Sequence, residues 1–278
     1  MNRKHFLKLA GLTSIAGMTT TGSFAEQPAV NKNRKAVDLQ LGLASYTLRT
    51  LKLDDVIKTA KRLDLKGIAL KSMHMPLEAS AEETKATAEK VRVAGLKLYG
   101  AGVIYMKTAQ EVDTAFAYAS NAGIETIIGV PNYEFLPQVN ELVKKYNIKL
   151  AVHNHGPGDN LYRSPNHVYE KIKDLDKRIG LCIDIGHVVR IGEDPIALIK
   201  KYKDRLYDMH MKDVDKVAED GTPVEIGRGV IDIPGVIGAL KSIGYSQQVA
   251  IEYEKDGEDP VPGLAESVGY LRGVIKLA

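Results

Sequence analysis

The sequence predicts an α/β protein that folds as a single-domain (β/α)8 TIM barrel. Short β-rich runs alternate with amphipathic helical stretches, eight such units follow one another, and together they occupy roughly 240 residues, as this barrel requires. A doubly wound open sheet is the alternative, but it usually has a glycine-rich phosphate turn after its first strand, and residues 44–47 contain no glycine. The expected strands are 39–46, 65–70, 96–101, 126–130, 149–153, 180–184, 206–210 and 248–252.

Three of the helices between these strands are especially clear. The range 54–63 places its apolar residues at helical spacing behind Asp54, whose carboxylate is expected to cap the first turn. The ranges 82–94 and 234–243 are each followed by a glycine, which suits the left-handed conformation that closes many helices.

The N-terminus predicts a signal peptide over residues 1–25. Two basic residues precede the apolar stretch 6–18, and Ser23-Phe24-Ala25 forms a small-x-Ala cleavage site. The string 2–8 also resembles a twin-arginine signal with its second arginine replaced by lysine, so the ordinary secretory route and the twin-arginine route both stay open. A retained anchor is the alternative to cleavage. We expect an exported, periplasmic protein, with residues 26–36 as a polar linker before the barrel domain, 37–278.

Charge and cysteine content limit the possible partners. Removing residues 1–25 takes away three of the 38 basic residues and none of the 35 acidic ones, so the mature chain has no net charge. A neutral chain lacks the basic surface that nucleic acid binding needs, which also disfavours a nuclease. The single cysteine, Cys182, excludes an intramolecular disulfide, and no membrane span is expected in the mature chain.

Polar residues gather where the last four strands end. In a TIM barrel the chemistry takes place at the carboxyl ends of the strands, and imidazoles and carboxylates that converge there indicate a site for a divalent first-row metal. The alternative is that each histidine is a core or surface residue with no ligand. The residues concerned are His153, His155, Asp184, His187, His210 and Glu252.

Four motifs give the chain a resemblance to a known superfamily. They are CIDIGH at 182–187, HMKD at 210–213, GRGVIDIP at 227–234, and IGY at 243–245 leading to IEYE at 251–254. In this order and spacing, the chain resembles the sugar phosphate isomerase/epimerase superfamily of xylose isomerase-like TIM barrels over essentially the whole mature chain. The motifs are specific for the superfamily and say little about the substrate.

The resemblance implies a set of metal ligands. Members hold Mn, Mg, Co or Zn through a Glu of the fifth strand, an Asp of the sixth, a His of the seventh and a Glu of the eighth. By motif, Asp184, His210 and Glu252 take the last three places, and His153 stands where the usual Glu would be. Imidazole is still a good ligand but makes the site softer, so we expect one divalent metal, with Mn, Co, Zn or Ni favoured over Mg.

The replacement of the usual Glu by His153 also affects which reaction we expect. Epimerases of the superfamily use two metal-bound glutamates as a paired acid and base, and here one of the pair is replaced. Deprotonation beside a carbonyl followed by elimination needs one base and one acid, and related barrels include dehydratases and enzymes that cleave keto-glycosides. Since an exported protein rarely meets sugar phosphates, we expect a lyase or hydratase acting on an unphosphorylated 3-keto-glycoside or similar keto-sugar. A sugar isomerase or epimerase acting on a ketose is the alternative, and a non-catalytic sugar-binding barrel is the second alternative.

Individual roles follow from this hypothesis. Glu252 or His155 is the candidate base, and His187 or Lys212 the candidate acid or oxyanion partner. Lys212 either lies beside the metal, which would lower its pKa, or pairs with Asp213. Arg228, Tyr46 and His74 are expected to bind the substrate. We expect no covalent nucleophile and no organic cofactor, and a homo-oligomer stays open.

Overall fold

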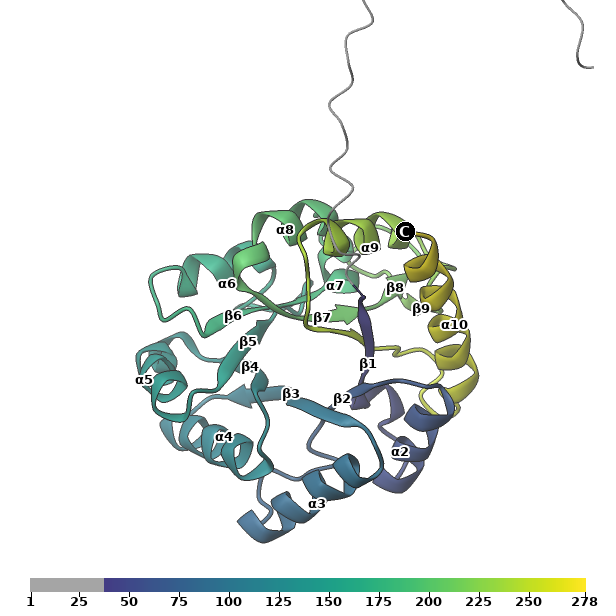
Figure 1. The fold of residues 1–278 in the computed structure, drawn as a ribbon. Helices are drawn as coiled ribbons and strands as arrows, with labels where there is room; N and C mark the ends of the chain where they lie inside the picture. The colour runs from purple at the N-terminus through teal and green to yellow at the C-terminus, as the bar shows by residue number, and fades with distance from the viewer. Residues whose placement is uncertain (1–37) are drawn as a thin grey trace, which may run out of the picture. The chain divides into compact units, whose positions relative to one another are not determined.

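A computed structural model describes residues 38–278 of the chain (Figure 1). The predicted signal peptide and linker, 1–25 and 26–36, lie outside the described residues. The described residues, 38–278, belong to one compact unit. No helix among residues 38–278 is both long and apolar enough to cross a membrane.

Eight parallel strands close into a barrel, which confirms the predicted fold class (Figure 1). Neighbours around the barrel follow the order β1-β10-β7-β6-β5-β4-β3-β2, so chain order and spatial order agree throughout. Each predicted strand matches an observed one, although β3 continues five residues further than expected. The strands are β1 Gln40–Ala44, β2 Gly67–Leu70, β3 Lys97–Met106, β4 Thr126–Pro131, β5 Lys149–His153, β6 Ile179–Asp184, β7 Leu206–Met211 and β10 Gln248–Ile251.

Helices follow the strands and form the outer ring of the barrel (Figure 1). Short 3-10 turns complete the connections at η1 (Ser45–Leu48), η2 (Tyr133–Phe135) and η3 (Lys203–Arg205). The helices are α2 Leu53–Arg62, α3 Ala81–Val93, α4 Ala109–Ala122, α5 Leu136–Tyr146, α6 Pro165–Ile172, α7 Ile185–Arg190, α8 Pro195–Lys201, α9 Ile233–Ser242 and α10 Val261–Leu277.

The expected helix ends are confirmed, but the expected cap of α2 is wrong. Gly95 and Gly244 follow α3 and α9 with φ of 86° and 71°, the left-handed region that glycine adopts at little cost. The helix α2 begins after Lys52, and no side chain caps it. Asp54 lies inside the first turn, where its negative charge interacts favourably with the positive end of the helix dipole. Its carboxylate also forms an ion pair with Lys90.

The core is continuous from the strands to the inner faces of the helices. All residues of β4 and β6 are buried, as expected for parallel strands that are covered on both sides. The apolar face of α2 packs Val56, Ile57 and Ala60 inward, with 0–8% of each side chain exposed. This packing holds the strand ends in fixed positions, which is what a site assembled from several strands requires.

A small hairpin lies in the connection after β7. It pairs β8 (Asp213–Val214) with β9 (Pro223–Val224) in antiparallel fashion. The carboxylate of Asp213 accepts hydrogen bonds from the backbone N–H groups of Gly227 and Gly229, at 2.9 and 3.0 Å, and from that of Ile231 at 3.2 Å. Asp213 therefore organises this connection and does not pair with Lys212, so that alternative for Lys212 is wrong.

Candidate active site

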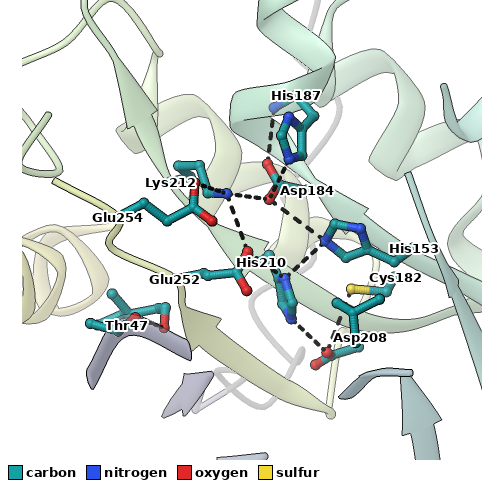
Figure 2. Close-up of polar contacts among 12 residues, drawn as sticks. Thr47, His153, Cys182, Asp184, His187, Asp208, His210, Lys212, Glu252 and Glu254 are labelled. Carbon is teal, nitrogen blue, oxygen red and sulfur yellow. Dashed lines mark hydrogen bonds and ion pairs between the residues drawn. The ribbon is translucent and has the colours of Figure 1, made fainter. Parts of the chain in front are cut away.

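The four predicted metal ligands meet at the carboxyl ends of four adjacent strands (Figure 2). His153 ends β5, Asp184 ends β6, His210 lies near the end of β7, and Glu252 directly follows β10. The strand register places Asp184 beside His210. All four side chains are buried, and one potential ligand atom from each lies within 4.8 Å of the others. The structure thus brings together the whole set that the motifs implied.

The distances within this cluster fit a shared ion. His153 Nε2 lies 3.0 Å from His210 Nδ1, and His210 Nδ1 lies 3.0 Å from Glu252 Oε2. His153 Nε2 is 3.7 Å from Asp184 Oδ2, a buried oxygen that also lies 2.9 Å from Lys212 Nζ. Bonds of about 2.0–2.2 Å to one ion hold neighbouring ligand atoms roughly 3–4 Å apart. The donor set of two imidazoles and two carboxylates therefore suits a divalent metal.

Lys212 reaches into the same cluster and binds three carboxylates (Figure 2). Its Nζ lies 2.9 Å from Asp184, 3.2 Å from Glu252 and 3.1 Å from Glu254. Burial alone would lower the pKa of Lys212, but these carboxylates outweigh it and raise the pKa well above its usual value. Gly186 leaves room for this side chain, since a Cβ there would lie 2.8 Å from Lys212 Cδ.

The charges of the cluster stabilise one another. Burial would raise the pKa values of Asp184 and Glu252, but Lys212 and neighbouring imidazoles hold both well below their usual range. Burial lowers the pKa of His153 well below its usual value. His153 is therefore neutral, the form in which an imidazole binds a metal.

Asp208 lies beneath His210, on the side away from the other ligands (Figure 2). Its Oδ2 is 3.5 Å from His210 Nε2 and accepts a weak hydrogen bond from Cys182 Sγ at 3.6 Å. Burial raises the pKa of Asp208 to about 6. Burial would lower the pKa of His210, but Glu252 and Asp208 raise it to about 9. Asp208 was not predicted, although its position two residues before His210 places both side chains on one strand face.

A cavity of 440 Å³ opens above the ligand cluster. Its volume is in the range of ligand-binding pockets. Tyr46, His155 and His187, three of the predicted site residues, line it as expected. His153 and Glu252, two of the predicted metal ligands, also line it. Lys71 directly after β2, and Val103 and Tyr105 near the end of β3, were not predicted, because the sequence shows no cluster of metal-binding residue types there. The lining consists of Tyr46, Lys71, Val103, Tyr105, His153, His155, His187, Glu252 and Glu254.

His155 is held from two sides. Tyr105 packs against its ring, with centroids 5.6 Å apart, and the Tyr105 hydroxyl lies 3.0 Å from His155 Nε2. On the other side, His155 Nδ1 is 3.2 Å from Asp159 Oδ2. Asp159 also accepts backbone N–H groups of Leu161 and Tyr162 at 2.6 and 2.9 Å, which fixes its carboxylate. With a proton on Nδ1 facing Asp159, Nε2 of His155 carries the lone pair, and at the cavity wall this lone pair accepts the Tyr105 hydroxyl.

His187 faces the ligand cluster from the start of α7. Its backbone N–H donates to Asp184 Oδ1 at 2.9 Å, and its ring Nε2 lies 3.9 Å from Asp184 Oδ2. Burial lowers the pKa of His187 to about 4. Its neutral ring therefore offers one N–H donor and one acceptor at the cavity wall.

The structure does not bring Arg228 and His74 into the cavity. Arg228 is exposed and forms a two-pronged ion pair with Glu266 of α10, at 2.5 and 2.7 Å. His74 is buried behind the cavity wall, where its Nδ1 lies 2.9 Å from Ser45 Oγ and its Nε2 3.1 Å from the Leu51 carbonyl oxygen. Both side chains are thus engaged in structural contacts.

Known proteins that resemble this chain include members of one family, the xylose isomerase-like TIM barrel. The profile of the xylose isomerase-like TIM barrel family matches residues 57–274. The inosose dehydratase of Geobacillus thermodenitrificans (strain NG80-2) is 28% identical over 152 residues, 49% of this chain and 48% of that protein, so the chain spans about half the length of this curated relative.

Two solved structures share the fold. The IOLI protein with a binding zinc atom has a TM-score of 0.74 at 16% identity, covering 86% of this chain and 99% of that one. The L-ribulose 3-epimerase has a TM-score of 0.70 at 14% identity, covering 86% and 95%. At these identities the likeness concerns the fold alone.

Proposed function

Because the chain belongs to the xylose isomerase-like TIM barrel family, we propose that it is a divalent-metal-dependent carbohydrate lyase. Its substrate is an unphosphorylated 3-keto-glycoside or a similar keto-sugar, from which it removes a proton beside the carbonyl and expels the group one carbon further on. The similarity to an inosose dehydratase supports elimination, since a dehydratase removes water from its substrate. The export signal predicted for residues 1–25 supports a periplasmic location, where sugars are met without phosphate.

His153, Asp184, His210 and Glu252 hold the metal in this proposal. A bound divalent ion polarises a carbonyl oxygen and thereby acidifies the neighbouring C–H bond. The IOLI protein, which shares this fold, has a binding zinc atom, and this supports a metal in the present barrel. With two imidazoles among the donors, Mn, Co, Zn and Ni are favoured over Mg.

His155 is the base in this proposal, in preference to Glu252. Glu252 Oε2 already contacts His210 and Lys212, and Glu254 contacts Lys212 as well. His155 instead lines the cavity, with 23% of its side chain exposed, and Asp159 orients it. Lys212 binds every carboxylate of the cluster and of the cavity wall, so His155 is left as the available base. This observation carries the lyase proposal. Epimerisation would require a second free base on the opposite face of the sugar.

His187 stabilises the oxygen on which negative charge develops after deprotonation, and Lys212, whose three donors are engaged by carboxylates, adds its positive charge nearby. Both reach the Asp184 side of the cluster, where Lys212 brings a positive charge and His187 a neutral N–H donor. Fixed donors in a buried site stabilise a developing oxyanion more strongly than water does. Tyr46 is a wall against which the sugar packs.

Proton and product analysis by NMR tests the proposal. The metal-loaded protein is incubated in deuterated water with a 3-keto-glucoside and, separately, with free ketohexoses. Release of the aglycone together with an unsaturated keto-sugar, abolished by EDTA and by His210→Ala, is the expected result. Deuterium uptake into ketohexoses with epimer formation would replace the lyase by an isomerase. Absence of turnover together with a sugar affinity that EDTA leaves unchanged would make the barrel a binding protein.

A further inference from the structure

Lys71 directly follows β2 and contributes a positive charge to the cavity wall. In the barrel order, β2 stands opposite β6, which carries Asp184, so Lys71 lies across the barrel mouth from the ligand cluster. Its Nζ donates to the carbonyl oxygen of Val103. Within residues 38–278, no carboxylate lies at ion-pair distance from Lys71, in contrast to Lys212 with its three. An ammonium has three donors, so two N–H groups stay available to a ligand.

Aromatic rings surround this amine. Its Nζ lies 6.0 Å from the ring centre of Tyr46 and 5.6 Å from that of Tyr105. Tyr105 is 47% exposed and lines the cavity, where an aromatic side chain offers packing surface to a second ring of the substrate. Burial also lowers the pKa of Lys71, which eases loss of its proton.

The backbone of Lys71 is fixed behind the wall. Its N–H donates to Ser45 Oγ at 2.8 Å, and the same oxygen lies 2.9 Å from His74 Nδ1. His74 in turn contacts the carbonyl oxygen of Leu51. Through these hydrogen bonds, the buried His74 and Ser45 fix the backbone of Lys71. The Lys71 side chain therefore meets a substrate in a defined position.

We propose that Lys71 is the catalytic acid that protonates the leaving group, while Tyr46 and Tyr105 form the subsite for that group. The inference rests on the proposed lyase activity. His155 takes the proton from the carbon beside the carbonyl, a carbon–carbon double bond forms, and the bond from the next carbon to the leaving oxygen breaks. The electron pair goes to that oxygen, which receives the proton of Lys71 and departs as an alcohol or as water. The neutral amine regains a proton from solvent.

Leaving-group dependence tests this role. Elimination is measured for Lys71→Met with methyl 3-keto-glucoside, whose leaving group needs protonation, and with 4-nitrophenyl 3-keto-glucoside, whose leaving group does not. We expect a loss of at least about 100-fold for the methyl substrate and a change of a few-fold for the nitrophenyl one, with proton exchange in deuterated water retained. Lys71→Arg keeps the charge but is a poor proton donor, so it should resemble Lys71→Met.

Lys107→Met is the matched control. Lys107 is exposed, its Nζ lies 5.8 Å from the centre of the same Tyr105 ring, and it does not line the cavity. Its removal should leave both rates unchanged. Equal losses for the two substrates in Lys71→Met, or recovery in Lys71→Arg, would overturn the acid role. An unchanged Lys71→Met would overturn it and leave the lyase intact, whereas absence of elimination by the unaltered protein would overturn both.

Discussion

Asp208 lies directly beneath His210, with Oδ2 3.5 Å from Nε2, while His210 Nδ1 faces His153 and Glu252. A carboxylate on the far nitrogen of a ligating imidazole fixes its orientation and its tautomer. We therefore expect Asp208→Ala to weaken zinc binding by about 10–100-fold, measured by competition with a chelator of known affinity.

Cys182→Ser is the control for this change. Cys182 donates to the same Asp208 oxygen, but its weak hydrogen bond leaves the contact between Asp208 and His210 in place. The serine variant should bind zinc within about 3-fold of the unaltered protein, since hydroxyl and thiol both donate to the carboxylate. An Asp208→Ala variant with full zinc affinity would show that strand packing alone orients His210.

Replacing His153 with glutamate should change the metal preference. A third carboxylate makes the ligand set harder and more negative, which favours Mg²⁺ and Mn²⁺ relative to Zn²⁺. We expect His153→Glu to raise the ratio of Mg²⁺ to Zn²⁺ affinity by at least about 10-fold, measured by calorimetric titration of each metal. His153→Gln, which removes the imidazole without adding charge, should weaken both metals, and an unchanged ratio in the glutamate variant would contradict the assignment of His153 as a ligand.

Metal binding should stabilise the fold. An ion that binds only the folded chain at 100 times its Kd adds about 2.7 kcal/mol to the free energy of unfolding, which raises the Tm of a chain of this size by roughly 5–10 °C. Thermal denaturation with zinc and with EDTA measures this difference. His210→Ala should abolish the zinc-dependent rise in Tm. His167 is exposed and is not a ligand, so His167→Ala should keep this rise.

Acid should reveal the contribution of Asp159 to stability. Burial would raise the pKa of Asp159, but hydrogen bonds from His155 and from the backbone N–H groups of Tyr162 and Leu161 hold it at about 2, below the usual 3.8. A lowered folded-state pKa stabilises the charged form, so this contribution is present above pH 3.8 and is lost as the pH falls through about 2.

The corresponding variant is Asp159→Asn. At pH 5 it should reduce the free energy of unfolding by up to about 2 kcal/mol, and the gap between the two proteins should close as the pH approaches 2. Urea denaturation at a series of pH values measures the gap. A difference that stayed constant with pH would mean that packing, and not the carboxylate charge, makes the contribution.

The sequence predicted the barrel well because its signals are local. Alternating β-rich and helical runs locate each strand to within a few residues, as β5 at 149–153 shows. Closure then brings four strand ends together regardless of the details of the loops, so His153, Asp184 and His210 converge as their motifs implied. The cap of α2 was predicted wrongly because the N-cap position is Lys52, two residues before Asp54.

Residues whose role depends on a partner distant in sequence were harder to predict. Two roles were possible for Lys212 from its neighbours along the chain, yet its partners are Asp184, at the end of β6, and Glu252 and Glu254, which follow β10. Arg228 was expected to bind the substrate, but Glu266, 38 residues later, holds it at the surface. Such pairings depend on how loops and helices pack, which a local pattern does not encode.

His155 as the base gives the most direct test of the active-site assignment. His155→Gln keeps a polar side chain beside Tyr105 and Asp159 but cannot accept a proton, so exchange of the proton beside the carbonyl should fall by about 10²–10⁴-fold in deuterated water. Zinc affinity should change by less than about 3-fold, because His155 is not among the four ligands. His167→Gln, an exposed histidine on α6, is the control and should exchange at the full rate. If His155→Gln exchanged normally while Glu252→Gln, loaded with metal, did not, the base would be Glu252, and the ion pair with Lys212 would have to open during the reaction.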